Sequence, residues 1–433
     1  MKAIIMTYGC QMNELDSEVA RKYLKDEGYD FTEDLSEADL ILINTCCVRE
    51  SAEKRIYGRA NWLKRYKYKN PALIIGVIGC LAQKDKQEVF KKIPHADFVL
   101  GPQEVKTLPE VLKKVKMGKK YIGHFYEKEY ISEGDRVVPL NPFKAWLSIM
   151  KGCDNYCSYC IVPYVRGHEV SKPYEIIEDE FRYLHSIGMK DVTLLGQNVN
   201  SYGKGMEEDI NFSKLLQKLD KLNLIPRIRF VTSHPKDFSF ELADTIKNGK
   251  NLCPHIHLPF QAGSNKILKE MNRKYTIENY MEKIDYIKKN LPNASITTDI
   301  IVGFPGETEE DFNHTMDVVK KVRFDSAHTF IYSERSGTKA ATYDNKVPEE
   351  VKKERIKHLI EVQNEISLEI NQKMKNVETE ILIEGVDKKG DFMQGRTTSN
   401  KIVLIPYNQK LMGEIVKVRI TEGLHWTLYG ELI

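Results

Sequence analysis

Three cysteines within eight residues are the strongest chemical signal in this sequence: Cys153, Cys157 and Cys160. A short loop with the spacing CxxxCxxC can wrap a [4Fe–4S] cube and give three of its irons a thiolate, which leaves one iron open to another ligand. A zinc knuckle is the alternative for such thiols. A zinc site usually takes a fourth Cys or His, and His168 is the only candidate close by.

A second set of three thiols is spread over the first domain: Cys10, Cys46 and Cys80, separated by 36 and 34 residues. Each follows a strand-like run, and each interval has about the length of a βα unit. The carboxyl ends of parallel strands meet along one edge of a sheet, where ligands bind, so the three thiols can converge on one cluster. The alternative is three separately buried cysteines that act as small apolar side chains.

The elements that position the second set are strand-like runs at residues 3–7, 40–44 and 73–79, which alternate with amphipathic stretches such as 17–27. This alternation predicts a doubly wound α/β domain with a parallel sheet, assigned to residues 1–126. A polar stretch at 127–142, with Gly134 and two prolines, predicts a linker after it.

The central part carries six further strand-like runs, at residues 146–150, 192–196, 227–232, 255–259, 297–302 and 327–332. A helical pattern follows each run, so residues 139–370 are predicted to form six βα units. Such units build a barrel or partial barrel with its chemistry at the carboxyl ends of the strands. A charged amphipathic helix is expected from Pro348 to about Lys373. A small all-β domain is predicted over residues 373–433, from runs at 379–383, 402–405, 414–420 and 427–432.

The composition excludes several classes of protein. With 433 residues and 41% hydrophobic side chains, the chain can build a core in each of two or three domains, so a mainly disordered protein is excluded. The net charge of +3 gives no overall cationic field. The longest nearly apolar run, 73–82, is well short of the ~18 residues that span a bilayer, and the N-terminus lacks a secretory signal. We therefore expect a cytoplasmic protein with no membrane partner, whose eight cysteines bind metal or react rather than form disulfides.

The segment with Cys153, Cys157 and Cys160 resembles the signature of the radical S-adenosylmethionine (SAM) superfamily, including the aromatic residue before the last cysteine, Tyr159. The resemblance implies a partial (β/α)6 barrel and a [4Fe–4S] cluster whose open iron is chelated by SAM. Reduction of such a cluster cleaves SAM to a 5′-deoxyadenosyl radical, which needs a dry, closed site.

Three segments of the first domain resemble the cluster-binding segments of the methylthiotransferases, namely residues 7–13, 44–49 and 79–80. The resemblance extends over the whole chain, and the last domain is similar to a TRAM domain, a small RNA-binding barrel. The resemblance implies a second [4Fe–4S] cluster on the second set of thiols, with Cys46 rather than its neighbour Cys47 as the ligand. Cys47 and Cys253 are expected to be ordinary packed thiols.

Within that family, Gln11, Met12 and Asn13 resemble the MiaB branch, the tRNA-2-methylthio-dimethylallyladenosine synthases. This branch implies methylthiolation of carbon 2 of isopentenyl-adenosine at position 37, in the anticodon stem-loop of tRNA. SAM would then serve twice, as radical source and as methyl donor, and an external electron donor and a sulfur source would be further partners. The alternatives are methylthiolation of threonylcarbamoyl-adenosine in tRNA or of a ribosomal protein. An alternative from another class is an iron–sulfur protein that binds RNA or transfers electrons.

Glycine and polar residues at the ends of several central runs resemble family segments that line the SAM pocket. With Tyr159, the candidate SAM contacts are Gly196, Gln197, Ser233, Gln261 and Thr298. A turn or a helix N-cap explains these residues equally well. Beyond the cluster cysteines, no catalytic residue is assigned.

Residues 54–69 hold seven basic side chains and no acidic one, interleaved with four aromatic side chains. Basic groups can neutralise phosphates and exposed aromatic rings can stack on unpaired bases, so this segment is a candidate RNA surface. The candidate contacts are Lys54, Arg55, Tyr57, Arg59, Trp62, Lys64 and Arg65. A solvated helix face is the alternative.

Overall fold

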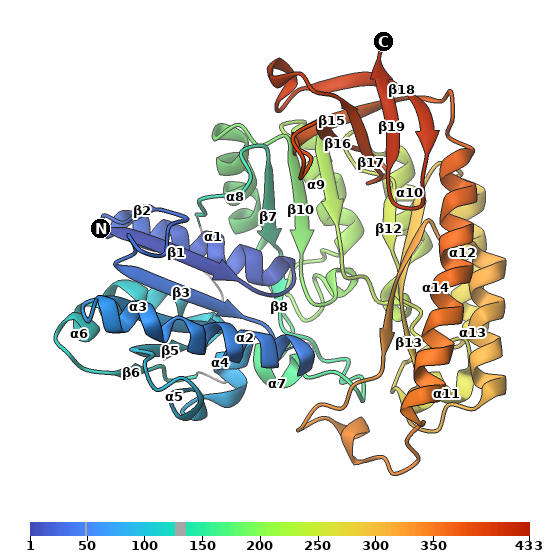
Figure 1. The fold of residues 1–433 in the computed structure, drawn as a ribbon. Coiled ribbons are helices and arrows are strands. Elements are labelled where there is room, and N and C mark those ends of the chain that lie inside the picture. The colour runs from blue at the N-terminus through green and yellow to red at the C-terminus, as the bar shows by residue number, and fades with distance from the viewer. Residues whose placement is uncertain (48–49, 126–135) are drawn as a thin grey trace.

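The computed structural model of the protein describes residues 1–47, 50–125 and 136–433, so most of the predicted linker at 127–142 lies outside the described residues. The first part of the chain is a six-stranded parallel sheet in the order β2-β1-β3-β4-β5-β6 (Figure 1). Its strands are β1 (Lys2–Thr7), β2 (Asp30–Phe31), β3 (Leu40–Thr45), β4 (Ile74–Gly79), β5 (Phe98–Leu100) and β6 (Tyr121–Ile122). The strand order reverses between β1 and β3, which makes their carboxyl ends the switch point of the sheet.

Helices cover both faces of this sheet. One face carries α1 (Gln11–Asp26) and α6 (Leu108–Lys116). The other face carries α2 (Glu50–Trp62), α3 (Lys64–Lys69), α4 (Cys80–Asp85) and α5 (Glu88–Lys92). Alternate residues of a strand point to opposite faces, so Leu40 and Leu42 join the core under α1, whereas Ile41 and Ile43 join the other core. The predicted doubly wound domain is confirmed.

The first helix begins at Gln11 rather than at the predicted residue 17. Its first turn is held against the sheet by the side chain of Asn13, whose amide nitrogen donates to Asn44 Oδ1 and to the carbonyl of Thr45. The apolar period of the sequence carries no sign of this contact with the sheet, which explains the late predicted start.

The central part is an open arc of six parallel strands, so the predicted partial barrel is confirmed. One sheet holds β7 (Lys144–Ser148), β10 (Asp191–Leu195) and β11 (Arg227–Phe230), and the other holds β12 (His255–His257), β13 (Ser295–Val302) and β14 (Ser326–Ile331). A single parallel bridge between Ile228 and Leu252 joins the two sheets.

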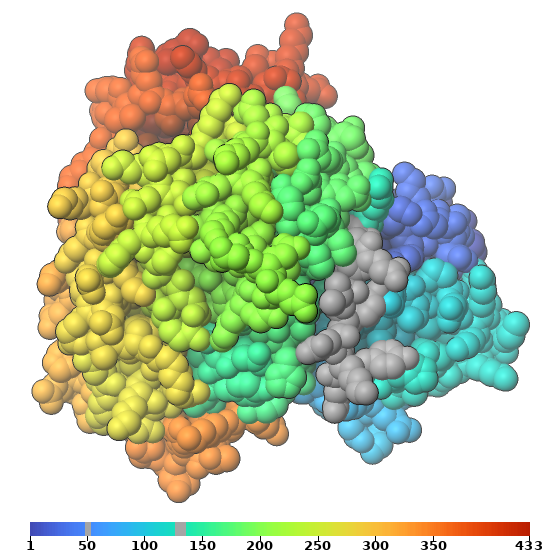
Figure 2. All heavy atoms as spheres, turned by 180° about the vertical axis from the view of Figure 1, so that it is seen from behind, coloured from blue at the N-terminus to red at the C-terminus, as the bar shows by residue number. Residues whose placement is uncertain are grey.

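Six helices lie on the outer side of this arc and form the central, green to yellow part of the face seen in Figure 2. They are α8 (Tyr174–Ser186), α9 (Phe212–Leu222), α10 (Phe240–Asn248), α11 (Asn265–Glu270), α12 (Ile277–Asn290) and α13 (Glu309–Val322). Side chains cap the amino ends of several of these helices: Asn211, Ser239, Ser264, Thr276 and Thr308 each accept a backbone N–H of the first turn.

The predicted first strand of the central domain, 146–150, is in fact two short strands. β7 ends at Ser148, and β8 (Met150–Lys151) leaves the arc to pair antiparallel with β9 (Val170–Ser171). The apolar run continues through both strands, so periodicity alone could not show the change of partner. The β8–β9 pair brackets the loop with Cys153, Cys157 and Cys160 and the short helix α7 (Val162–Arg166).

The last part is reached through α14 (Glu349–Gln372) and is a closed five-stranded barrel in the order β15-β16-β17-β19-β18. Its strands are β15 (Glu378–Val386), β16 (Phe392–Thr397), β17 (Ile402–Pro406), β18 (Ile415–Gly423) and β19 (Leu428–Leu432). The sequence predicted four of them and missed β16, whose mixed polar residues and Gly395 weaken the strand pattern. A side chain at Gly395 would come within 2.8 Å of the carbonyl oxygen of Leu382, so the close approach of β15 requires the glycine.

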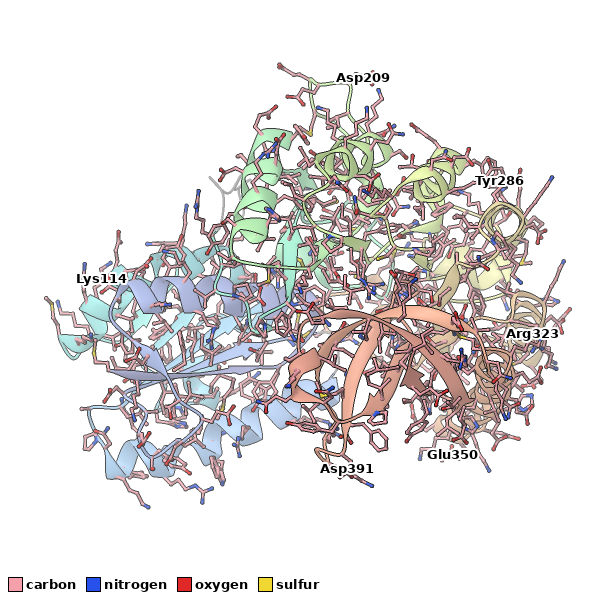
Figure 3. All side chains as sticks on the ribbon, turned by 90° about the horizontal axis from the view of Figure 1, so that it is seen from above. Lys114, Asp209, Tyr286, Arg323, Glu350 and Asp391 are labelled. Carbon is pink, nitrogen blue, oxygen red and sulfur yellow. The ribbon has the colours of Figure 1, made fainter. Side chains whose placement is uncertain are left out.

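This small barrel sits at the amino ends of the central strands, opposite the cysteine loop (Figures 1 and 3). Arg229 on β11 donates from both terminal nitrogens to the carbonyls of Thr398 and Thr397, at 2.7 and 2.8 Å. Lys144 at the start of β7 pairs with Glu384 at 3.0 Å. Asp391, labelled in Figure 3, marks the turn between β15 and β16 at the outer edge of the barrel.

No helix within the described residues combines the length and the apolar character that a membrane span requires.

Candidate functional site

The loop between β8 and β9 carries the first set of cysteines, Cys153, Cys157 and Cys160, which we call the loop thiols. Gly152 precedes them with φ at +75°, and a side chain there would come within 1.7 Å of the carbonyl oxygen of His168. The chain can therefore close on itself only with glycine at this position. The loop is closed by the N–H of Cys153, which donates to the carbonyl of Gly167 at 3.1 Å.

Cys157 is buried and Cys153 and Cys160 are half-buried, so the loop thiols need a positive partner to ionise. Burial is the main cause that raises the pKa of Cys153 to about 11 and that of Cys160 to about 12. Two donors reach these sulfurs: Arg273 Nη1 lies 3.4 Å from Cys157 Sγ, and Asn155 Nδ2 lies 3.4 Å from Cys153 Sγ. Thiolates are the ligands of iron, and the irons of a cluster supply the positive charge that this burial demands. The residues present therefore fit a [4Fe–4S] cluster.

Buried polar atoms without a partner among the described residues gather after β10 and β11. They are Gln197 Oε1, Asn198 Oδ1, Asn200 Oδ1 and Nδ2, Ser233 Oγ and His234 Nε2. Unpaired polar atoms are costly when buried, and a polar ligand at the carboxyl ends of these strands would satisfy them. SAM carries an ammonium, a carboxylate and ribose hydroxyls, so the residues present fit it.

His234 adds a defined donor to this set. Its Nδ1 accepts the N–H of Lys236 at 3.1 Å, so the unpartnered Nε2 carries the ring hydrogen. Burial, with the nearby positive charges of Arg273, Lys236 and Lys283, lowers the pKa of His234 to about 2, which keeps the ring neutral.

The other candidate SAM contacts have structural roles in the described chain. A side chain at Gly196 would come within 2.4 Å of Met150 Cγ, so β8 packs directly against this position. Gln261 has φ at +69° and forms a bridge with Ile300 of β13. Thr298 is fully buried, and its hydroxyl donates to the carbonyl of Leu258 and accepts the N–H of Phe260. Tyr159 is half-buried against the central core.

The second set of cysteines, Cys10, Cys46 and Cys80, which we call the N-terminal thiols, lies at the switch point of the first sheet. They follow β1, β3 and β4, whose last residues are in parallel register. A side chain at Gly9 would come within 2.9 Å of Cys46 Cβ, and one at Gly79 within 2.5 Å of the carbonyl oxygen of Thr45. The two glycines thus let the three chain segments approach one another.

A network of amides holds these segments together. Asn13 Nδ2 bonds Asn44 Oδ1 at 3.1 Å and the carbonyl of Thr45 at 3.0 Å, and Asn44 Nδ2 bonds the carbonyl of Asn13 at 2.7 Å. The Cys10 thiol donates to Asn13 Oδ1 at 3.5 Å. The segments 7–13 and 44–47 are therefore one structural unit, while Val48 and Arg49 lie outside the described residues.

Cys47 is buried, as expected of a packed thiol, but its thiol also contacts a member of the N-terminal set. Its interaction with the Cys80 thiol raises the pKa of Cys47 and lowers that of Cys80. Cys46 is also buried and packs beside Gly9. Cys253 is buried near Arg229, far from both sets in the fold.

One arginine of the central domain bonds an N-terminal thiol, and another bonds the main chain beside Cys46. Arg166 ends α7, six residues after Cys160, and its Nε donates to Cys80 Sγ at 3.2 Å while its terminal nitrogens bond Asp16 on α1 at 3.3 and 2.7 Å. Arg335, after β14, donates to the carbonyl of Cys47 at 2.9 Å. The tertiary structure therefore brings the two sets of thiols to adjoining ends of two domains.

The sequence analysis missed Arg166, Arg273 and Arg335. An isolated arginine carries no local pattern that marks it as a hydrogen-bond donor to a cysteine segment. The only sign in the sequence was the position of Arg166, six residues after Cys160.

Among residues 1–47, 50–125 and 136–433, no three or more Cys, His, Asp or Glu side chains are arranged to hold a single metal ion. A four-iron cube bonds each thiolate to a different iron, so its ligands need not meet at one point. His168, the candidate fourth ligand of a zinc knuckle, has its Nδ1 bonded to Asp154 Oδ1 at 2.8 Å. All eight cysteines are described, and none forms a disulfide.

The basic segment forms α2 and α3, on the face of the first sheet opposite α1 (Figure 1). Its most exposed candidates are Lys54, Arg55, Lys64 and Arg65. The Tyr57 hydroxyl donates to the Asp85 carboxylate. The guanidinium carbons of Arg59 and Arg65 lie 4.0 and 3.5 Å from the centroid of the Trp62 ring.

The histidines of β12 are hydrogen-bonded. Both His255 and His257 bond Thr297 Oγ1, at 3.1 and 3.0 Å.

Three family models match successive parts of the chain. They are described as uncharacterized protein family UPF0004 over residues 2–101, the radical SAM superfamily over residues 147–319, and the TRAM domain over residues 372–433.

Relatives named tRNA-2-methylthio-N6-dimethylallyladenosine synthase match along the whole chain. The protein from Caldicellulosiruptor saccharolyticus is 50% identical, with 99% of this chain and 92% of the relative covered. The protein from Thermoanaerobacter pseudethanolicus is 48% identical, again with 99% and 92% covered.

Among solved structures, the chain is similar to the radical SAM methyltransferase TsrM from Kitasatospora setae, solved with cobalamin and a [4Fe–4S] cluster. The TM-score is 0.58 at 14% identity, over 78% of this chain and 76% of that one. At this identity the similarity shows a shared fold.

Proposed function

Because this chain belongs to the family of the tRNA-2-methylthio-N6-dimethylallyladenosine synthases, we propose that it replaces the hydrogen on carbon 2 of isopentenyl-adenosine, at position 37 of tRNA, with a methylthio group. The observation that carries the proposal is the convergence of two sets of three thiols from two domains. Arg166 shows this convergence most directly, because it follows the loop thiols in the chain and bonds Cys80 of the N-terminal thiols. A single-cluster enzyme has no need of a second set.

We assign one [4Fe–4S] cluster to the loop thiols and a second to the N-terminal thiols. When bound, the first cluster with SAM supplies a 5′-deoxyadenosyl radical, and the second carries the sulfur to which another SAM gives its methyl group. The burial of the loop thiols supports the first assignment, and the glycines beside Cys46 and Cys80 support the second. The domain boundaries 1–126, 139–370 and 373–433 remain part of this proposal.

The chain's own residues hold and orient SAM in this proposal. Gln197 Oε1 can accept from the SAM ammonium, and Ser233 and the Nε2–H of His234 can donate to its carboxylate or ribose. Thr298 and Gln261 act indirectly, because their bonds shape the turn after β12. Gly196 keeps the space beside Met150 that a side chain would fill.

The substrate is proposed to be the anticodon stem-loop of tRNA, with the exposed basic side chains of α2 and α3 binding phosphates. These helices belong to the domain that carries the N-terminal thiols, so RNA bound there lies on the side of the molecule that holds the site. The electron donor and the sulfur source are proposed to come from outside the chain, since reduction and sulfur supply need reagents that SAM does not provide.

The test is anaerobic turnover of the reconstituted protein with SAM, dithionite and sulfide. Three substrates are compared: tRNA with isopentenyl-adenosine at position 37, the same tRNA with threonylcarbamoyl-adenosine, and ribosomal protein. Nucleoside and peptide mass spectrometry should find the methylthio group only in the first. A product on another substrate would replace the proposal with that alternative, and the absence of 5′-deoxyadenosine would favour a carrier of electrons or RNA.

A further inference from the structure

Each set of thiols has one buried arginine that donates a hydrogen bond to one of its sulfurs. Arg166 is 7% exposed, and its Nε lies 3.2 Å from Cys80 Sγ. Arg273 is 8% exposed, and its Nη1 lies 3.4 Å from Cys157 Sγ. The two arginines come from different elements, α7 and the turn after α11, so each set of thiols has a donor of its own.

Both guanidinium groups are held in place by their remaining nitrogens. Arg166 bonds both carboxylate oxygens of Asp16, and Arg273 bonds the carbonyl of Pro259 at 3.0 Å and the Tyr275 hydroxyl at 3.2 Å. Asp16 offsets part of the positive charge of Arg166. The bonded partners of Arg273 are neutral groups and the Cys157 sulfur, so Arg273 presents more of its charge to its own set of thiols.

We propose that Arg166 and Arg273 are positioning residues that raise the reduction potentials of the two clusters, Arg166 at the N-terminal thiols and Arg273 at the loop thiols. The inference rests on the proposed function, which assigns a cluster to each set. On reduction one electron enters a cluster, which goes from the 2+ to the 1+ state, and no bond forms or breaks. Negative charge grows on the sulfurs, and a nearby N–H donor with a positive charge stabilises that state.

The experiment uses the full-length chain with one set of thiols removed at a time, so that each cluster is observed alone. One background carries Cys10→Ala, Cys46→Ala and Cys80→Ala, and the other carries Cys153→Ala, Cys157→Ala and Cys160→Ala. Each is reconstituted anaerobically with iron and sulfide, its iron content is measured, and its cluster is titrated with dithionite while the reduced state is followed by electron paramagnetic resonance.

The expected result is selective. Arg166→Gln should lower the equilibrium constant for reduction of the N-terminal cluster at least tenfold, about 59 mV for one electron, and leave the loop cluster unchanged. Arg273→Gln should lower the equilibrium constant for reduction of the loop cluster and leave the N-terminal cluster unchanged. This shift in reduction potential should be the larger one, because the charge of Arg273 is less offset. Arg182→Gln, an exposed arginine on α8, is the matched control and should change neither potential.

Arg166→Gln leaves the largely buried Asp16 without its partner, so Arg166→Gln with Asp16→Asn is prepared as a second variant. Arg166→Lys and Arg273→Lys keep the positive charge but lack the planar guanidinium group with its several N–H donors, so their shifts in reduction potential should be smaller. The proposal is overturned if every variant that holds four irons keeps the parent potential, or if each variant shifts both clusters alike. A parent background that holds no four-iron cluster would instead contradict the proposed function, which the iron content shows before any potential is measured.

Discussion

Single residues explain why the two sets of thiols can assemble. Glycines stand where the chain must pass close to another segment: Gly9 beside Cys46, Gly79 beside Thr45, and Gly152 against the carbonyl of His168. Each would force a main-chain shift if it carried a side chain, because the distances to neighbouring atoms are all under 3 Å. The chemistry of the site therefore depends on residues that touch no cofactor.

Single substitutions should show that the loop thiols and the N-terminal thiols have different functions. Cys153→Ala should abolish SAM cleavage, because the two remaining thiolates leave that loop one ligand short of the three that position the cluster for chelation. Cys10→Ala alters the other domain, so 5′-deoxyadenosine should still form while methylthiolated tRNA is lost. Both products are measured by liquid chromatography with mass spectrometry.

The control for this pair is Cys253→Ala, which removes a buried thiol that belongs to neither set and should leave both products at the parent level. Normal methylthiolated tRNA from Cys10→Ala would return the N-terminal thiols to the role of packed side chains.

A buried carboxyl on α1 gives a second prediction for a single residue. Glu18 is 1% exposed, accepts the N–H of Leu140 at 2.9 Å, and has its pKa raised to about 8 by burial. Between the ordinary value of 4.5 and this value, the folded chain keeps a proton that the unfolded chain has released, so stability falls as pH rises through that window. Glu18→Gln should flatten this fall, measured as Tm from about pH 5 to about pH 8.

Glu33→Gln, at an exposed position of the same domain, is the matched control and should keep the parent profile. A fall in Tm for Glu18→Gln as steep as that of the parent would show that Glu18 is not its source.

At the scale of elements, α7 is the link between the two sites. It follows the loop thiols after one residue, packs through Val165 into the core of the first domain, and ends at Arg166 on Cys80. A five-residue helix thus belongs to the central domain by sequence and to the first domain by packing.

Helices α2 and α3 carry the prediction for RNA. Arg55→Ala, Lys64→Ala and Lys69→Ala together should weaken tRNA binding, because their exposed charges neutralise phosphates. The slope of log affinity against log salt should fall by roughly 0.7 to 0.9 for each phosphate that is no longer neutralised. SAM cleavage without RNA should be unchanged. Binding is measured by fluorescence anisotropy at several salt concentrations.

The matched control removes three exposed lysines from α13 and α14, Lys320, Lys353 and Lys357, on the side of the molecule away from the first domain. If both triple variants bind tRNA equally weakly, a general effect of net charge explains the result and α2 and α3 revert to a solvated helix face.

At the scale of the whole molecule, the small barrel and the cysteine loop lie at opposite ends of the central strands. Arg229 fixes the barrel there through two carbonyls and is itself paired with Asp191 at 2.8 Å. The first domain, by contrast, packs α1 beside β7 and reaches the carboxyl ends, where the loop thiols lie, at α7 and Arg166 (Figure 1). An RNA that contacts both outer domains must therefore extend along the central domain.

The whole chain should hold about eight irons after anaerobic reconstitution, because each of the two sets of three thiols is proposed to hold a four-iron cluster. Iron and acid-labile sulfide are measured per chain, and Cys253→Ala should match the parent. Saturation at four irons per chain, with all six cluster cysteines intact, would contradict the assignment of two clusters.

Local sequence patterns were enough to predict the three fold types, their order and the two sets of cysteines. These are local signals: the loop thiols lie within eight residues, and strand and helix periods repeat over a few residues. The same locality explains the errors. β16 has a weak pattern, the run at 146–150 hides a change of strand partner, and α1 begins early because Asn13 bonds a strand 31 residues away.

How these parts meet depends on contacts between residues that are far apart in the chain. Arg166 and Asp16 are 150 residues apart, and Arg335 and Cys47 are 288 apart, so no window of sequence contains either contact. The same holds for the hydroxyl of Thr298, which the backbone uses, and for the placement of the small barrel by Arg229. Which donor faces which sulfur follows from the packing of whole domains, because burial and hydrogen bonding are properties of the assembled surfaces and not of any segment alone.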